Sequence, residues 1–164
     1  MCDPSSSNPL YQAFFKACKE LGLRETDDFN GYCQEGFQWH DFNIAKGRRQ
    51  STAVAFLRSA LKRSNLHIER YSQATRILFD GRKAIGIEFD YHGSRRKIFA
   101  SREIILCCGS INSPSLLMHS GVGDANQLKK FGIDVVHNLP GVGRNLQDHI
   151  GVYVQHESLE PVTM

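Results

Sequence analysis

Gly109-Ser-Ile-Asn-Ser-Pro-Ser-Leu-Leu-Met-His-Ser-Gly-Val-Gly123 is the stretch that decides the fold of this chain, and it directly follows the apolar run Glu103-Ile-Ile-Leu-Cys-Cys108. The apolar run predicts a buried parallel strand that ends in a tight turn at Gly109. Ser113 and Pro114 predict the start of a helix, with a hydroxyl cap before proline at the first helical position. Gly121 and Gly123 predict its end. A strand that turns at a glycine into a helix is a place where backbone can approach a nucleotide cofactor closely.

Upstream of this stretch, the hydrophobic period between residues 66 and 100 is two, which predicts a β-meander. The expected strands are residues 66–70, 75–79, 84–91 and 97–100. Asp80-Gly81 and His92-Gly93 predict hairpin turns between them.

Elsewhere the sequence predicts three helices, two of them from cap residues. Asn8 and Pro9 open the first, which Gly22 closes, and Ser51 or Thr52 caps the second, which ends near residue 63. The third covers residues 125–131 and precedes a short strand at residues 135–136. Residues 26–46 keep no sustained period and predict an extended or looping segment.

Composition excludes several classes of protein. The net charge of +3 is too small and too dispersed to indicate a nucleic-acid partner. The five cysteines have no C-x-x-C spacing and are odd in number, which argues against a disulfide framework. Cys107 and Cys108 lie in the apolar run and are therefore expected to be reduced core residues.

Membrane and targeting signals are also missing from the sequence pattern. No stretch approaches the roughly 18 consecutive apolar residues that can cross a bilayer. The first eight residues, Met-Cys-Asp-Pro-Ser-Ser-Ser-Asn, have neither the apolar core of a signal peptide nor the arginines of a transit peptide.

The complete string 109–123 resembles the second signature of the glucose–methanol–choline (GMC) oxidoreductases, a family of FAD-dependent alcohol oxidases and dehydrogenases. Residues 30–37, 47–57 and 139–149 are also similar to segments of this family, and residues 28–57 look most like its choline dehydrogenases. The signature positions present here are Gly109, Ser110, Ser113, Pro114, Leu117, Met118, Ser120, Gly121, Val122 and Gly123.

The resemblance covers the chain from about Pro9 onward and implies an internal section of a longer enzyme. It implies an α/β fold of mixed α+β character: part of an FAD-binding domain of the glutathione-reductase type with its β-meander, plus part of the substrate-side cap. The expected divisions are residues 1–64 in the middle segment, 65–123 with the meander, apolar strand and signature, and 124–164 as the start of the next segment.

The resemblance also implies the ligands. FAD is the expected cofactor, with Ala74, Gly109 and Ser110 as cofactor-binding residues, and Ala74 acts mainly through its backbone. A small-molecule alcohol, choline, is the expected substrate. A mitochondrial location follows from the resemblance alone.

Other motifs weigh against further sites in this chain. A dinucleotide fingerprint needs a third glycine, and Asn126 and Leu146 stand where Gly121-Val-Gly123 and Gly141-Val-Gly143 would require it. The seven histidines have no metal-binding spacing, so no metal site is expected. No catalytic residue is assigned here, because the family's catalytic histidine lies nearer the C-terminus than this chain reaches.

Two alternatives stay open. Tyr32, Phe37 and Trp39 fit either an aromatic cage for a quaternary ammonium group or, more commonly, core packing beneath a loop. The chain as a whole fits either a section of an FAD-dependent alcohol dehydrogenase or a truncated, non-catalytic binding or regulatory module of the same family.

Overall fold

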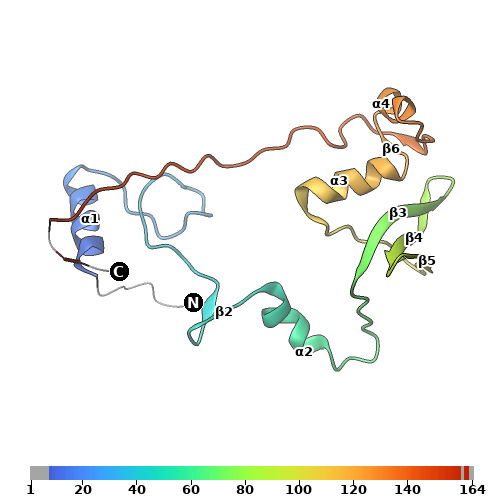
Figure 1. Ribbon diagram of the computed structural model, residues 1–164. Helices are drawn as coiled ribbons and strands as arrows, with labels where there is room; N and C mark the ends of the chain where they lie inside the picture. The colour runs from blue at the N-terminus through green and yellow to red at the C-terminus, as the bar shows by residue number, and fades with distance from the viewer. Residues whose placement is uncertain (1–7, 160, 163–164) are drawn as a thin grey trace. The chain divides into compact units, whose positions relative to one another are not determined.

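The computed structural model describes residues 8–159, 161 and 162. The prediction about targeting signals falls mainly on residues 1–7, which lie outside the described residues. The chain divides into two compact units, residues 1–67 with 152–164 and residues 68–151 (Figure 1). Within the described ranges, no helix is both long enough and apolar enough to cross a membrane.

The first unit begins with helix α1 (Pro9–Glu20), and its start is the predicted one. The Asn8 side chain accepts a hydrogen bond from the Leu10 N–H (2.9 Å), and proline follows at the first helical position. Gly22 has a φ of +72°, which only glycine adopts easily, and the helix has ended just before it. Local capping chemistry is enough to set both ends of this helix.

The core of the first unit is aromatic. Phe37 is buried, and its ring meets Phe15 of α1 edge to face with 5.2 Å between centroids. Phe15 also stacks on Trp39 at 4.5 Å. Backbone bonds from Phe37 N–H to the Arg24 carbonyl and from Thr26 N–H to the Phe37 carbonyl fix this loop beside the helix.

Residues 44–60 add two small elements to the first unit. Strands β1 (Ile44–Ala45) and β2 (Arg48–Arg49) form an antiparallel hairpin that the sequence pattern did not predict. Its two turn residues both have positive φ, as a type I′ turn requires. The predicted second helix is present as a π-helical turn, η1 (Ala53–Leu57), that continues into α2 (Arg58–Ala60).

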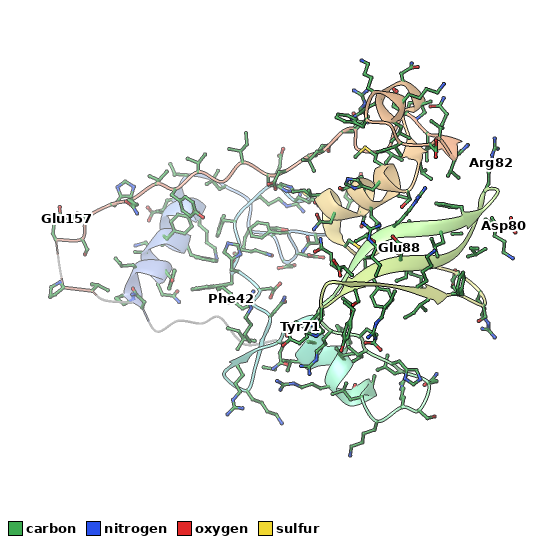
Figure 2. All side chains as sticks on the ribbon, turned by 45° about the vertical axis from the view of Figure 1, so that its right-hand side comes forward. Phe42, Tyr71, Asp80, Arg82, Glu88 and Glu157 are labelled. Atoms are coloured by element: carbon green, nitrogen blue, oxygen red, sulfur yellow. The ribbon has the colours of Figure 1, made fainter. Side chains whose placement is uncertain are left out.

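The second unit contains the predicted meander. Strands β3 (Ser72–Asp80), β4 (Lys83–Tyr91) and β5 (Ser94–Phe99) form an antiparallel sheet in that order. Asp80 and Arg82 mark the tip of the first hairpin in Figure 2. In this sheet, Ile77 of β3 and Phe89 of β4 are buried, whereas all six residues of β5 are exposed.

Two predicted strands are not formed. Residues 66–70 lie outside the sheet, because Tyr71, with a φ of +58°, interrupts the extended backbone before β3 begins. Residues 103–108 form no ladder either, although Ile104 and Leu106 are half-buried while Ile105 is 75% exposed. A strand apolar on both faces needs parallel neighbours, and no segment among the described residues pairs with it.

The thiols in this run also differ from the expectation. Cys107 and Cys108 are both exposed rather than buried in a core. The cause is the same, since the neighbouring strands and covering helices that would bury them are not supplied by the described part of the chain.

Helix α3 (Gly109–His119) starts five residues earlier than predicted. Ser113 and Pro114 therefore lie inside it. The Ser113 hydroxyl reaches back to accept a bond from the Cys108 N–H (3.1 Å). Because proline has no N–H, the Ser110 carbonyl loses its helical partner at position 114.

The end of α3 is the predicted one. Ser120 caps the helix, and Gly121 follows with a φ of +88° and an N–H bonded to the Met118 carbonyl. Strand β6 (Val122–Gly123) then pairs in parallel with β7 (His137–Asn138), close to the predicted strand at 135–136. Between them lies α4 (Ala125–Lys130), capped by the Asp124 carboxylate.

Candidate cofactor site

A cavity of about 460 Å³ lies where β3 meets α3, and both of its walls belong to the second unit. This volume falls in the range typical of small-molecule and cofactor sites. The lining residues are Gln73, Ala74, Thr75, Cys108, Asn112, Ser115, Leu116 and His119. No Asp, Glu, Lys or Arg side chain is among them, and the hydrogen-bonding groups come from Gln, Thr, Asn, Ser and His side chains.

The β3 wall is shaped by a bulge at Thr75. Ala74 pairs with Phe89 and Arg76 with Glu88, which leaves Thr75 as an extra residue on its strand. The Thr75 hydroxyl donates to the Glu88 carbonyl (3.2 Å). The bulge disrupts the ladder locally at residues 74–75, both of which line the cavity.

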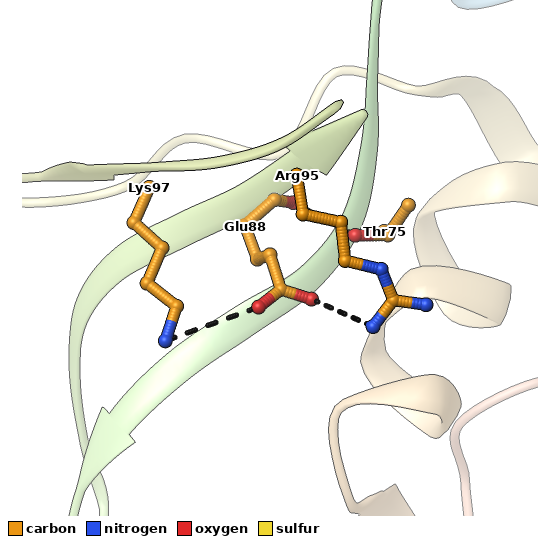
Figure 3. Close-up of polar contacts among 4 residues, drawn as sticks. All are labelled: Thr75, Glu88, Arg95 and Lys97. Atoms are coloured by element: carbon orange, nitrogen blue, oxygen red, sulfur yellow. Dashed lines mark hydrogen bonds and ion pairs between the residues drawn. The ribbon is translucent and has the colours of Figure 1, made fainter. Parts of the chain in front are cut away.

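The strand behind this wall is held by charges. The Glu88 carboxylate, 17% exposed, lies 3.7 Å from the Arg95 guanidinium and 4.0 Å from the Lys97 ammonium (Figure 3). These three residues belong to adjacent strands β4 and β5, so the ion pairs span the sheet. Both cationic partners are solvent-exposed, so each pair is worth at most about 1 kcal/mol.

The α3 wall begins at Gly109, a position where any other residue would be strained. Gly109 has a φ of +87°, and a Cβ built on it would meet no atom within 4 Å. The positive φ requires glycine, and the empty space beside it leaves the backbone open to an incoming group. The first N–H groups of an α-helix have no partner within the helix and attract anionic groups.

The three predicted cofactor residues differ in how close they lie to the cavity. Ala74 lines the cavity, and Gly109 adjoins the lining residue Cys108. Ser110 lies on the exposed first turn of α3 and is not part of the lining. All three assignments stay predictions.

The remaining signature residues build the fold around the cavity. Ser120 is fully buried, donates to the Leu116 carbonyl (2.6 Å) and accepts from the Ile77 N–H (2.8 Å), so it joins α3 to β3. A Cβ on Gly121 would collide with the Asp134 carbonyl. A Cβ on Gly123 would press on the Met118 side chain at 3.1 Å. The signature therefore fixes how helix, meander and β6 pack together.

The aromatic residues singled out in the sequence are not brought together. Phe37 is buried against Phe15, whereas Tyr32 is fully exposed. Trp39 instead contacts Phe15 and Tyr11 of α1. Core packing is thus the observed role of Phe37, and the described residues hold no cage made of these three rings.

Several lining residues gave no signal in the sequence. Gln73, Thr75, Asn112 and His119 are ordinary strand and helix residues until the fold brings β3 against α3. The His119 ring lies 3.4 Å from the Ser115 hydroxyl. Across the described ranges, no group of three or more His, Cys, Asp and Glu side chains is arranged to hold a metal ion.

Comparison with known proteins gives a consistent result. The model of the GMC oxidoreductase family matches residues 2–151. Mitochondrial choline dehydrogenase of Mus musculus is 49% identical over 159 residues, and oxygen-dependent choline dehydrogenase of Chromohalobacter salexigens is 48% identical over 161 residues. These matches cover 97% and 98% of this chain but only 27% and 29% of the two relatives.

Solved structures agree with the fold. Pyridoxine 4-oxidase from Mesorbium loti superposes with a TM-score of 0.80 and 35% identity, over 91% of this chain and 29% of its own. An FAD-dependent oxidoreductase from Chaetomium thermophilum gives a TM-score of 0.77 at 32% identity, over 85% of this chain and 25% of its own. The mixed helix-and-sheet fold predicted from the sequence is confirmed by these neighbours.

Proposed function

Because this chain belongs to the GMC oxidoreductase family, we propose that it is a section of an FAD-dependent dehydrogenase that oxidises choline to betaine aldehyde. The observation that carries this proposal is the sequence identity of 49% and 48% to two choline dehydrogenases over nearly the whole chain. The chain spans less than a third of those relatives, so it supplies one part of the enzyme.

Two features of the described residues support the proposal that this cavity holds part of the FAD nucleotide. Its volume lies in the range typical of cofactor sites, and its lining includes hydrogen-bonding side chains on β3 and α3, beside the Thr75 bulge and the Gly109 corner. Ala74 is proposed to hold the cofactor through its backbone, together with the corner at Gly109 and the freed carbonyl of Ser110.

The chemistry divides between cofactor and protein. When bound, FAD supplies a hydride acceptor for alcohol oxidation. The residues of this chain hold and orient the nucleotide and keep β3 and α3 together around it. The base that takes the hydroxyl proton is proposed to lie outside this chain, because no residue here is assigned that role.

Location within the cell is a further part of the proposal. Mitochondrial placement is supported by the mitochondrial choline dehydrogenases of Mus musculus and Homo sapiens, at 49% and 47% identity. The bacterial relative from Chromohalobacter salexigens is equally similar. Fractionation of the native cells decides between a mitochondrial and another location.

The test uses the full-length protein that carries these residues. After addition of FAD, choline is expected to bleach the flavin absorbance in the absence of oxygen. The neutral isostere 3,3-dimethyl-1-butanol, which lacks the positive nitrogen, should react far more slowly. If FAD binds but choline leaves the flavin oxidised, the substrate is wrong; a protein that binds no FAD supports the non-catalytic module instead.

A matched pair of variants tests the proposed site. Gly109→Ala puts a side chain where φ is positive, and we expect FAD affinity to fall. Gly141→Ala adds the same methyl group where φ is ordinary and no atom lies within 4 Å, and FAD affinity should be unchanged. Equal affinities of the two variants in a fluorescence titration would contradict the role of Gly109.

A further inference from the structure

Three consecutive residues of strand β3 line the same cavity, namely Gln73, Ala74 and Thr75. In a regular strand, successive side chains point to opposite faces of the sheet, so a ligand on one face meets every second residue. The bulge between Ala74 and Arg76 interrupts that alternation, and bulges beside ligand sites re-aim side chains. The wall that β3 gives to the cavity therefore depends on this bulge.

The bulge leaves Thr75 without a partner in the ladder. Ala74 lies opposite Phe89 and Arg76 lies opposite Glu88, and the extra residue of a bulge is unpaired. The Thr75 side chain makes a cross-strand bond instead, because its hydroxyl donates to the Glu88 carbonyl (3.2 Å). This bond takes the place of the ladder pairing that Thr75 lacks, and it ties the extra residue to the neighbouring strand.

Glu88 is itself held in place from the other side. It belongs to β4, the central strand of the meander, and lies opposite Lys97 of β5. Its carboxylate lies within 4.0 Å of both Arg95 and Lys97, and Figure 3 shows this cluster together with Thr75. All of these contacts are made within one three-stranded sheet of this chain, so they need no other part of the enzyme.

We propose that Thr75 is a positioning residue for the cofactor: its hydroxyl, bound to the Glu88 carbonyl, holds the bulge that brings residues 73–75 together on the cavity wall. This role rests on the proposed function, because it takes the cavity as the nucleotide site. The one hydroxyl proton of Thr75 is already donated to Glu88, so Thr75 acts through the backbone around it. A protein that forms the bulge less often binds FAD more weakly in proportion.

Two variants of Thr75 in the full-length protein separate the hydroxyl from the shape of the side chain. Thr75→Val keeps the branched shape that strands favour and removes the hydroxyl. Its dissociation constant for FAD, measured by flavin fluorescence, should rise about 2- to 10-fold, which is the range expected when one hydrogen bond is lost. Thr75→Ser keeps the hydroxyl and should bind FAD like the parent protein.

Ile87→Val is the matched control for a general loosening of the sheet. Ile87 is half-buried, lies opposite Ile77 of β3 and Ile98 of β5, and is not among the residues that line the cavity. The variant removes one methylene group from the same sheet and leaves the Thr75 bond in place. Its FAD dissociation constant should match that of the parent protein. A rise equal to that of Thr75→Val would mean that the hydroxyl has no role of its own.

Hydrogen exchange of the protein without FAD distinguishes positioning from direct contact. Peptides covering residues 72–80 and 83–91 should exchange faster in Thr75→Val than in the parent protein or Thr75→Ser, because the bulge is held less firmly. If FAD affinity falls while this exchange is unchanged, the hydroxyl contacts FAD directly and the positioning role is wrong. Faster exchange with unchanged FAD affinity overturns that role as well. If the parent protein binds no FAD, the proposed function fails and the cofactor role with it, while the exchange rates still decide whether Thr75 holds the bulge.

Discussion

Replacing Ser120 by alanine is expected to loosen the junction between α3 and the meander. The Ser120 hydroxyl is the acceptor for the Ile77 N–H in the middle of β3, and both residues are buried. Alanine removes that acceptor without giving water access to the amide. A buried donor left without a partner costs about 1–3 kcal/mol.

The effect should be visible at a single amide. An opening free energy lowered by about 1–3 kcal/mol speeds hydrogen exchange of the Ile77 amide by roughly 5- to 150-fold. Exchange is measured by NMR or by mass spectrometry on the full-length protein. Ser115→Ala is the matched control on the same helix, because the Ser115 hydroxyl lies 3.4 Å from the exposed His119 ring and its loss leaves the Ser120–Ile77 bond intact. Its cost should stay below about 0.5 kcal/mol.

The reasoning would be refuted by either of two results. Unchanged protection of the Ile77 amide in Ser120→Ala would mean that the hydroxyl does not hold the strand. An equal loss of protection in Ser115→Ala would mean that any change on this helix has the same effect, and that the buried bond is not its cause.

Three further outcomes are expected. Gly121→Ala should lower the unfolding free energy more than Gly132→Ala in urea titration, because both have positive φ but only Gly121 faces a collision, with the Asp134 carbonyl. Expressed alone, the 164-residue chain should hold no FAD at micromolar concentration, since it contains no dinucleotide fingerprint; a flavin absorbance band in the purified protein would contradict this. The same chain should melt broadly rather than sharply in calorimetry, because exposed side chains such as Phe99 and Ile105 each forfeit about 1.5–3 kcal/mol against a typical margin of roughly 5–15 kcal/mol.

Local signals predicted the elements whose stabilising contacts are close in sequence. The Asn8 cap, the helix predicted at residues 125–131 and the His92-Gly93 turn lie where the sequence indicated, because their signals act within a few residues. The run at residues 103–108 was predicted wrongly for the opposite reason. Its apolar composition indicates a strand, but a strand forms only when another segment pairs with it.

The candidate site could be predicted only in part. The signature located the Gly109 corner, because a turn with positive φ favours glycine and the glycine is visible in the sequence. The Thr75 bulge depends on the register between β3 and β4, and the lining by Gln73, Asn112 and His119 depends on how β3 packs against α3. Neither arrangement can be predicted from the residue types alone. Ser120 was identified as a signature position from the sequence. Its hydrogen bond to Ile77 could not be predicted, because the two residues are 43 positions apart and only the fold brings them together.

The open edge strand of the meander, β5, carries cationic side chains that oppose pairing with a second molecule. In the described part of the chain, β5 has a strand on one side only, so its other edge presents unpaired backbone groups. Arg95, Arg96 and Lys97 stand in succession along it, and the Glu88 carboxylate of β4 pairs with Arg95 and Lys97. A second copy arriving edge to edge would bring two such cationic rows to about 4.8 Å, the spacing of paired strands. Their repulsion opposes intermolecular strand pairing, and thus aggregation, at the open edge of β5.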